Sequence, residues 1–417
     1  MKHEKTALLN TLEAYFRAGI KSSYHQKIGV EVEHFILNEQ TGEALPYAGS
    51  GGVMEILKAL MALYPGAKAT GGDHLLGFEV PEFNITLEPA AQLEISIAYM
   101  ESVTEIEYIY LTFREKLDAV CRAFHACVRT CGTQPVSRVD DLQLIPKERY
   151  ALMDRYFTEA GTDGREMMRG TCSTQVSIDY FSEEDFRRKI QAAYYFTPLL
   201  KLLSDNSPVF QGVRTQGYLK RNDIWDRTDN RRCGVVPGIF AEDYSFADYA
   251  AFLAAMPVIF TEKDGLMNYT GLQSTADVYA GQAPDREETM HIISMAFPDV
   301  RLKQYLEIRA ADAMPARYIP AYCALIKGLL YSEEVLDRVQ GSIREHQMTE
   351  DTVRETQRQL MARGWDGEIY GRKAADFAAK AIGLAGQNLD DRERKVLEHL
   401  FEITGKGIAA INKVECE

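Results

Sequence analysis

The sequence lacks the short motifs by which many nucleotide-binding and hydrolytic enzymes are identified. It contains no GxxxxGK[ST] phosphate loop, no GxGxxG turn after a predicted strand, no HExxH helix and no GxSxG turn. No run of about 18 apolar residues occurs, so no membrane-spanning helix is predicted. A nucleotide could therefore be bound only by locally placed basic side chains or metal ions.

Positive charge is also scarce. The 417 residues include 47 Lys and Arg against 61 Asp and Glu, a formal net charge of −14. Such a field repels phosphate backbones and anionic lipid headgroups, so neither nucleic acid nor a membrane surface is an expected partner. With 46% apolar and 10% aromatic residues, the composition is typical of a globular protein and excludes a disordered chain.

Paired cysteines and a signal segment are missing as well. The seven cysteines form no CxxC pair, and we expect them to be reduced and buried; Cys127 and Cys131 lie one helical turn apart in an apolar stretch. The first residues, MKHEKTALLNTLEAYF, have scattered charges and no continuous apolar core. These features predict a cytoplasmic protein.

What the sequence does contain is a mixture of two hydrophobic periods. A period of two predicts strands within residues 27–37, 85–97, 171–180 and 301–310. A period near 3.6 predicts helices over residues 6–20, 54–63, 103–128 and 182–203, and a largely helical chain from residue 318 onward. Residues 205–245 form a long polar segment, which is usually functional. The pattern predicts an α+β fold with an antiparallel sheet covered on one face.

Each predicted strand carries charge or amide on one face. Alternation places Glu31 with Glu33, Gln92 with Glu94 and Ser96, and Glu307 with Arg309, while Gln175 lies on the polar face of its strand. Any one of these faces could simply meet water. Taken together, converging carboxylates would repel one another unless divalent cations were bound, and oxygen ligands suit Mg²⁺ or Mn²⁺ with a nucleoside triphosphate. Arg309 would supply positive charge for a phosphoryl group.

Five segments carry a resemblance to a known family. The runs IGVEVEHF, PAAQLEIS, MMRGTCSTQVSIDYFSEEDFRRK, RNDIWDRTDNR and FPDVRLKQYLEIRAADAMP, in this order, resemble glutamate-cysteine ligases of the plant and proteobacterial type over about residues 27–331. The resemblance implies a glutamine-synthetase-like, saddle-shaped, largely antiparallel six-stranded sheet, with helices on its convex side and a helical C-terminal tail. It also implies one catalytic domain over 1–417, with 332–417 a mostly helical extension.

The resemblance further implies an activity and a set of site residues. ATP would phosphorylate the γ-carboxylate of L-glutamate, and the amine of L-cysteine would then displace phosphate to give γ-glutamylcysteine. The implied roles are metal binding by Glu31, Glu33, Glu94 and Glu307, stabilisation of the transferring phosphoryl group by Arg309, and substrate binding by Arg169, Gln175 and Arg221.

Two departures from the family pattern keep alternatives open. Ala90 and Ala91 stand where the family carries glycines, and the segment AADAMP loses glycines of a turn. Both changes touch the predicted pocket rim. One alternative is a ligase that joins glutamate to a different amine, and another is a non-catalytic relative that binds glutamate or nucleotide.

Overall fold

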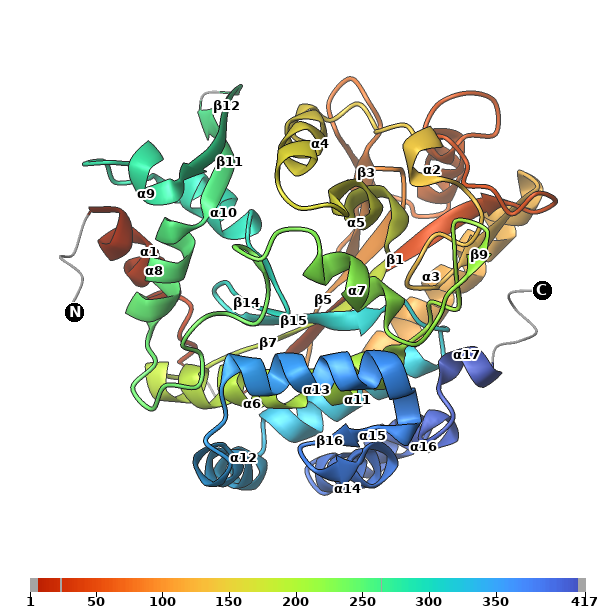
Figure 1. The fold of residues 1–417 in the computed structure, drawn as a ribbon. Coiled ribbons are helices and arrows are strands. Elements are labelled where there is room, and N and C mark those ends of the chain that lie inside the picture. Colours follow the sequence, from red (N-terminus) through yellow and green to blue (C-terminus); the bar gives the residue numbers. More distant parts are fainter. Residues whose placement is uncertain (1–6, 23–24, 264, 412–417) are drawn as a thin grey trace.

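An antiparallel sheet forms the centre of the structure, a computed structural model that describes residues 7–22, 25–263 and 265–411 (Figure 1). In this described part the sheet has nine strands, all paired in antiparallel fashion. Eight follow one another in the order β14 (Val300–Leu302), β15 (Leu306–Asp312), β7 (Ser173–Ile178), β1 (Ile28–Asn38), β5 (Leu93–Met100), β4 (Phe83–Leu87), β3 (Gly77–Glu79) and β2 (Lys68–Thr70). The ninth, β6 (Ala126–Arg129), pairs with the end of β1. The predicted α+β class is therefore confirmed, with nine strands where six were expected.

Two of the predicted strands are hairpins, which explains part of the higher count. The alternating stretch 85–97 divides into β4 and β5, because the turn between them contains Pro89, which has no amide proton, and Ala91 at φ 64°. The stretch 301–310 divides into β14 and β15 around a turn at 303–305. Side-chain parity survives across both turns, so the predicted faces remain correct.

The predicted helix 103–128 is also shorter than expected. Helix α3 spans Val103–Ala123 and is capped by the Ser102 hydroxyl, which accepts from the Thr104 amide. It ends before His125, whose φ of 53° is left-handed and cannot continue a right-handed helix. The chain then enters β6, so Cys127 and Cys131 do not lie on a helix.

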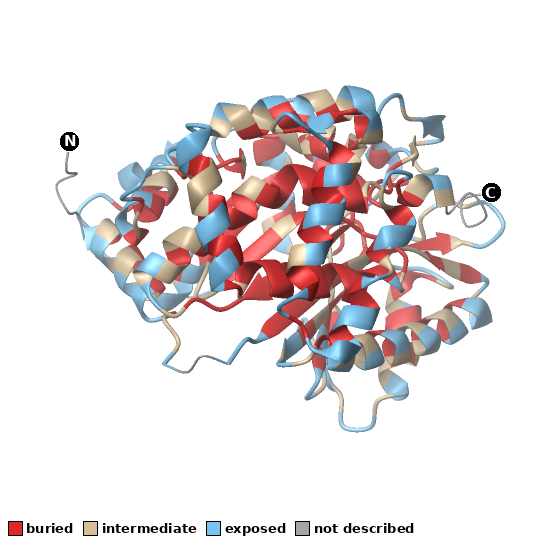
Figure 2. Ribbon diagram, turned by 90° about the horizontal axis from the view of Figure 1, so that it is seen from below, coloured by how far each residue is buried: buried red, intermediate tan, exposed pale blue. Residues whose placement is uncertain are grey.

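Three long helices cover the apolar face of the sheet. They are α3, α6 (Glu183–Ser204) and α11 (Tyr318–Leu330), which contact β5, β15 and β7 respectively. The Ser182 hydroxyl accepts from the Asp185 amide at 3.0 Å, as the predicted N-cap requires. Every residue of α11 is buried, and Figure 2 shows how much of this helical layer is covered by its neighbours. The core therefore lies between the sheet and these helices.

Further helices follow α11 toward the C-terminus, as predicted. They are α12 (Glu333–Glu345), α13 (Glu350–Arg363), α14 (Ala374–Gly386), α15 (Asp391–Leu397), α16 (Leu400–Ile403) and α17 (Ile408–Ile411). A short hairpin, β16 (Glu368–Ile369) and β17 (Arg372–Lys373), interrupts them. Within the described ranges, no helix combines the length and the apolar character needed to cross a bilayer.

The polar face of the sheet is covered by shorter elements from the middle of the chain. The predicted polar segment 205–245 contains β8 (Val209–Phe210), β9 (Val213–Arg214), α7 (Lys220–Asp226) and β10 (Cys233–Gly234). Helices α4 (Glu148–Glu159) and α5 (Gly164–Gly170) lie beside α7 on the same side of the sheet (Figure 1). This side of the sheet therefore lies beneath a partial cover rather than open to solvent.

The remaining elements flank this arrangement. They are α1 (Ala7–Arg17), α2 (Val53–Ala62), η1 (Val139–Asp141), α8 (Phe246–Ala255), β11 (Pro257–Lys263), β12 (Leu266–Ser274), α9 (Thr275–Val278), α10 (Arg286–Ser294), β13 (Phe297–Pro298) and η2 (Gly364–Asp366). Of the six described cysteines, all except the half-buried Cys127 are buried, as expected, while Cys416 lies outside the described residues.

Candidate functional site

The register of the sheet brings the predicted polar residues to one face. On the two sides of Glu31 lie Ser96 of β5 and Gln175 of β7, and Glu33 is paired with Glu94. Directly paired residues of antiparallel strands project on the same side. The carboxylates of β1 and β5 and the amide of β7 therefore share one surface, as alternation along each strand predicted.

Four carboxylates gather on this surface, and one of them was not assigned from the sequence. Glu31, Glu33 and Glu94 are joined by Glu88 from the turn between β4 and β5. Burial raises the pKa of all four, and repulsion by a neighbouring carboxylate adds to the effect for Glu31, Glu88 and Glu94. An acidic row of this kind favours either bound protons or a bound cation.

The four acids differ in their hydrogen bonds. Glu33 accepts from the Ser173 amide and hydroxyl, each at 2.8 Å, and Glu94 accepts from Thr86 at 3.0 Å. Within the described part of the chain, the side chains of Glu31 and Glu88 receive no hydrogen bond. These two carboxylates therefore have oxygen lone pairs available to a ligand.

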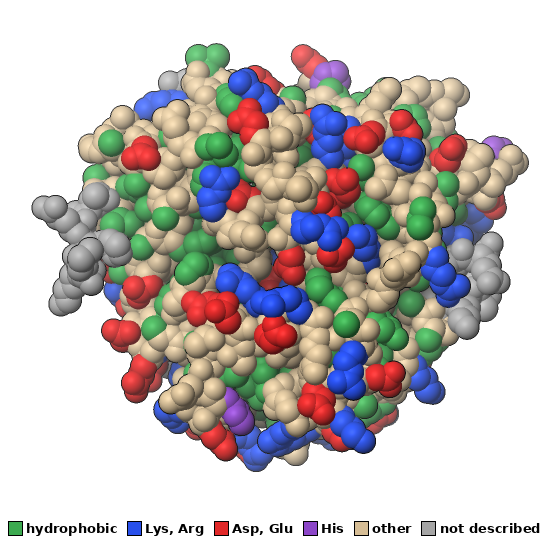
Figure 3. Space-filling model, viewed as in Figure 1, with side chains coloured by type: hydrophobic (Ala, Val, Ile, Leu, Met, Phe, Trp, Pro, Cys, Tyr) green, Lys and Arg blue, Asp and Glu red, His purple; other side chains and the backbone are tan. Residues whose placement is uncertain are grey.

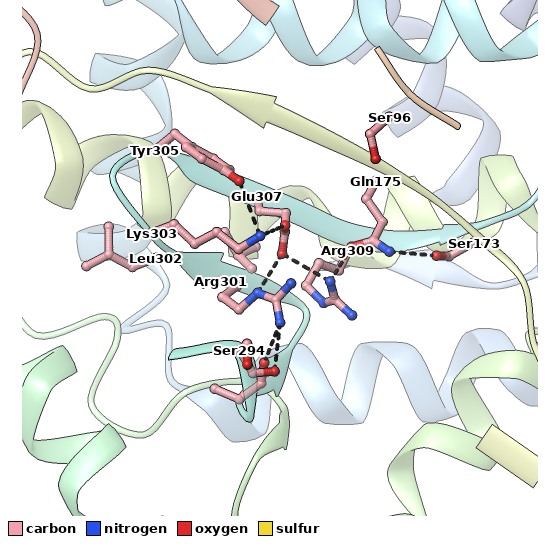
Figure 4. A network of polar contacts seen from close by, with 12 residues as sticks. Ser96, Ser173, Gln175, Ser294, Arg301, Leu302, Lys303, Tyr305, Glu307 and Arg309 are labelled. Carbon is pink, nitrogen blue, oxygen red and sulfur yellow. Dashed lines mark hydrogen bonds and ion pairs between the residues drawn. The ribbon is translucent and has the colours of Figure 1, made fainter. Parts of the chain in front are cut away.

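Glu307 lies in a different electrostatic environment on the same face. Its carboxylate accepts from Arg301 Nε at 2.6 Å, Lys303 Nζ at 2.6 Å and Arg309 Nη1 at 3.0 Å (Figure 4). Burial alone would raise the pKa of Glu307, but the three positive charges outweigh it and hold the pKa well below its usual range. This basic cluster, Arg301, Lys303 and Arg309 around Glu307, carries two more positive than negative charges.

Strand geometry positions the basic cluster. Arg301 and Glu307 are direct partners in the β14–β15 hairpin, and Lys303 lies in its turn. The register of β15 against β7 shifts between Ile308 and Ala311, at the position of Arg309. Arg309 Nη1 donates to the Gln175 side chain, and its Nε has no partner among the described residues. The guanidinium therefore retains a donor for another group.

A pocket connects the two clusters. It has a volume of about 90 Å³ and is lined by Glu33, Glu88 and Arg309 on the sheet side. Its apolar wall comes from α4, α5, α7 and the chain near β13, through Tyr150, Met153, Met167, Met168, Trp225 and Phe297. Figure 3 shows acidic and basic side chains intermingled across the middle of this face of the molecule.

The two predicted substrate-binding arginines are placed differently. Arg221 of α7 is buried, lies 5.1 Å from the ring of Trp225, and donates weakly to the Arg309 carbonyl at 3.5 Å. Its Nε has no partner in the described structure. Arg169 of α5 instead donates to Asp154 at 2.5 Å and to the Leu142 carbonyl at 2.8 Å. The structure therefore brings Arg221 to the site, whereas the Arg169 guanidinium is held by α4 and the preceding loop.

Sequence reasoning missed several residues that line or charge the site. Arg301 and Lys303 share the parity of Glu307 and Arg309, and Glu88 shares the parity of Glu94. If the alternation had been continued through both hairpin turns, it would have placed these three side chains on the polar face. Tyr150 and Trp225 carried no such signal, since they belong to helices whose docking on the sheet is a tertiary event.

The residues that the structure describes form no preformed metal site. Among the residues in the described ranges, no three His, Cys, Asp or Glu side chains converge closely enough to hold an ion. Mg²⁺ commonly takes only one or two protein carboxylates, with water and substrate phosphates completing its shell. The acidic row has the correct donor type, and its unbonded carboxylates fit a metal that arrives with a nucleotide.

Comparison with a solved structure identifies the fold class. The chain is similar to the glutamate-cysteine ligase of Francisella tularensis solved in complex with AMP, with a TM-score of 0.50 over 94% of this chain and 84% of that one. At 12% sequence identity this likeness shows the fold alone. The chain therefore has the glutamine-synthetase-like fold that the resemblance implied.

The sequence comparisons identify the family. Residues 27–414 match glutamate-cysteine ligase family 2 (GCS2), and the chain belongs to this family. It is 32% identical to the chloroplastic glutamate-cysteine ligase of Brassica juncea over 336 residues, which are 79% of this chain and 65% of the relative. It is 29% identical to the enzyme of Nicotiana tabacum over 405 residues, 94% of this chain and 76% of the relative. The chain thus spans just under two thirds of the length of the Brassica enzyme.

These relatives contradict the predicted cytoplasmic location. The enzymes of Brassica juncea, Arabidopsis thaliana and Nicotiana tabacum are all named as chloroplastic. The prediction was wrong because it rested on the missing apolar core of a secretory signal. Organelle transit peptides are amphipathic and polar, so that absence does not exclude them.

Proposed function

We propose that the chain is an ATP-dependent ligase that joins the γ-carboxylate of L-glutamate to the amine of L-cysteine. The observation that carries the proposal is the placement of the basic cluster and the acidic row on one sheet face of a glutamate-cysteine ligase family member. Phosphoryl transfer needs positive charge around the transferring group and positioned partners, and little covalent chemistry from the protein. Both kinds of group are present.

The reaction has two steps with this balance of atoms. An oxygen of the glutamate γ-carboxylate attacks the γ-phosphorus of ATP, the bond to the β,γ-bridging oxygen breaks, and ADP leaves. The cysteine amine then attacks the acyl carbon of γ-glutamyl phosphate, the bond to the phosphate oxygen breaks, and the amine loses a proton. The products are γ-glutamylcysteine, ADP and phosphate.

Arg309 is proposed as the residue that stabilises the transferring phosphoryl group. Its unpartnered Nε and its position beside the pocket support this role. Arg301 and Lys303 hold the Glu307 carboxylate and add two further charges nearby. A donor that interacts more strongly with the charge of the transition state than with the substrate lowers the barrier of the reaction. A donor that binds substrate and transition state equally well does not lower this barrier.

Substrate recognition is proposed for Arg221, Gln175 and Arg169. Arg221 is buried with a free Nε and is well placed to bind a carboxylate. Gln175 already bridges Arg309 and Glu33, so it would orient the arginine or contact substrate through its amide. Arg169 has an unpartnered Nε among the described residues, but its two Nη atoms would reach a substrate carboxylate only when their bonds to Asp154 and the Leu142 carbonyl open.

Mg²⁺ or Mn²⁺ is proposed as the cofactor, with one or two carboxylates of the set Glu31, Glu33 and Glu94 as its protein ligands, Glu88 close by, and water and substrate phosphates completing its shell. When bound, the ion would neutralise phosphate oxygens of ATP. The mutual repulsion and raised pKa values of these acids support a cation at this place. Glu307 is also a predicted ligand, but its oxygens become available only when one of its three cations turns to another partner.

We also propose that residues 1–417 form one catalytic domain, with 332–417 a mostly helical extension. The support is one large hydrophobic cluster that runs from Leu8 in α1 to Ile408 in α17. A small second cluster, made of Phe35, Leu37, Cys131, Cys172 and Ala313, includes residues of the same sheet. A boundary between independent domains would be crossed by few contacts.

Mass analysis of the products formed from glutamate, cysteine and Mg-ATP tests the activity. We expect γ-glutamylcysteine, and phosphate release that depends on both amino acids. A panel of other amines in place of cysteine identifies the acceptor, because only the true acceptor should strongly stimulate phosphate release. Nucleotide binding without ADP formation under any pair of substrates would contradict the proposal and indicate a binding protein.

A further inference from the structure

A second cavity lies in the C-terminal helical layer. It has a volume of about 250 Å³ and lies between α6, α12, α14 and the β16–β17 hairpin. These elements lie together along the lower part of Figure 1. None of the residues that line this cavity lines the pocket beside Arg309. The proposed ligase reaction therefore gives this cavity no role.

Aromatic rings form the floor of the cavity. The Tyr195 ring lies 4.9 Å from that of Tyr370 and 5.8 Å from that of Phe377, measured between centroids. Phe196 lies 6.2 Å from Phe377 and also lines the cavity. Aromatic rings pack favourably on other flat rings in offset or edge-to-face arrangements. The floor is therefore suited to a planar aromatic group.

The backbone at Tyr370 is strained, and the strain places its ring in this floor. Tyr370 and Gly371 form a two-residue turn between Ile369 and Arg372, with φ values of 50° and 75°. Such turns favour Asn, Asp or Gly at the first position, and a bulky residue with positive φ is uncommon. The Tyr370 hydroxyl donates to the Tyr195 carbonyl at 3.0 Å, which holds the ring in place. Strain of this kind is concentrated at functional positions.

The rim of the cavity has an excess of positive charge. Arg338, Arg372 and Lys380 line it, against one carboxylate, Glu345. Arg338 is paired with Glu334, but in the described part of the chain the side chains of Arg372 and Lys380 form no ion pair. Two uncompensated cations beside an aromatic floor are notable in a chain whose net charge is −14. They complement an acidic group on a bound molecule.

We propose that this cavity binds a small aromatic anion, a planar ring system that bears a carboxylate or a similar acid group. The ring would lie against Tyr195, Tyr370 and Phe377, and the acid group would face Arg372 and Lys380. The volume suits this class, since a cavity of about 150 Å³ holds benzene. One or two fused rings with an acid group fit the larger space.

Titration of the full chain with indole-3-carboxylate, followed by calorimetry and ligand-observed NMR, tests the proposal. We expect the acid to bind more tightly than two matched probes, indole-3-carboxamide, which lacks the charge, and cyclohexanecarboxylate, which lacks the aromatic ring. Equal binding of all three, or no binding of the acid, would overturn it. Displacement of the acid by excess Mg-ATP would also overturn it, because the probe would then occupy the nucleotide site.

Two variants locate the binding. In Arg372→Ala/Lys380→Ala, the acid should bind at least about threefold more weakly while the carboxamide is unaffected, since exposed ion pairs contribute modestly. In Tyr370→Gly, the glycine suits the left-handed backbone of the turn, so the variant should fold normally. It should bind the acid about tenfold more weakly, because one aromatic ring of the floor is lost. Arg392→Ala/Lys395→Ala, on the exposed surface of α15, is the control and should bind as the unaltered chain does. Unchanged affinity in both test variants would place the probe elsewhere and refute the assignment.

Discussion

The two ends of one sheet face carry the same residue type in opposite electrostatic states. In the acidic row, burial and neighbouring carboxylates raise the pKa values of Glu31 and Glu94. At Glu307, which is fully buried whereas Glu31 and Glu94 are half-buried, three cations hold the pKa well below its usual range. Strand alternation places all these acids on one face, but only their neighbours decide whether each is charged. The acidic row is prepared for a cation, whereas the basic cluster is prepared for an anion.

The largest expected difference between the two regions is in stability. Glu307→Gln leaves a buried cation, Arg301, and two half-buried cations, Lys303 and Arg309, without their carboxylate partner, and should lower the free energy of unfolding by about 3 to 5 kcal/mol. Glu31→Gln removes a repelling charge and should leave that free energy unchanged or raise it. Both variants should lower turnover by ~10² or more, since each loses a preorganised charge. Urea unfolding and steady-state ATP turnover measure the two effects.

Equal stability losses in the two variants would remove the distinction between the regions. Turnover like that of the unaltered chain in both would refute the roles proposed for these acids.

Removal of the Arg309 guanidinium tests the basic cluster directly. Arg309→Ala should lower turnover by about 10² to 10³, the usual effect of losing one donor that stabilises developing charge. Arg309→Lys should recover part of the loss, because it restores the charge but not the planar pair of donors. Arg317→Ala is the control, since Arg317 forms a half-exposed ion pair with Glu402 away from the pocket. A similar loss in the control would show a general effect on folding.

The pH dependence of stability should have opposite signs in the two regions. The pKa of Glu94 is raised in the folded state, so at pH values above the ordinary pKa of 4.5 the folded state binds more protons than the unfolded state. The free energy of unfolding therefore falls as pH rises through this range. The depressed pKa of Glu307 contributes stability that is present above 4.5 and lost as pH falls.

Urea unfolding across a pH series separates these contributions. In Glu94→Gln the decline of stability toward higher pH should be shallower, while the loss at low pH should be unchanged. A decline as steep as in the unaltered chain would mean that Glu94 does not titrate in this range.

The smallest expected effect concerns the turn that carries Glu88 into the acidic row. Ala91 has a φ of 64°, in the left-handed region that an alanine side chain disfavours. Ala91→Gly should therefore raise the free energy of unfolding by about 1 kcal/mol. Ala90→Gly, at a neighbouring position without positive φ, is the control and should not stabilise. Thermal unfolding of both variants would show whether the strain exists, and an unchanged midpoint in Ala91→Gly would contradict it.

The two hairpins show where sequence reasoning succeeded and where it failed. Alternation correctly placed Glu94 and Glu307 on polar faces, because a strand has a period of two whatever lies around it. It did not detect that each of the stretches 85–97 and 301–310 reverses direction, since the turns preserve parity. For the same reason, Glu88 and Arg301 went unassigned although they obey the pattern.

The amino-acid sequence by itself determined the α+β class, the amphipathic strands, the helical C-terminal tail and the family of this protein. The fold class, the strands and the helical tail follow from local periodicity. The family follows from sequence segments that occur along this chain in the order typical of that family. Tertiary structure alone decided that Glu307 is enclosed by three cations, that Arg169 is bound to Asp154, and that aromatic rings of α6 and α14 meet a strained turn. Contacts of this kind join residues far apart in the chain, and their energies depend on burial and neighbouring charge, which no local pattern of residues contains.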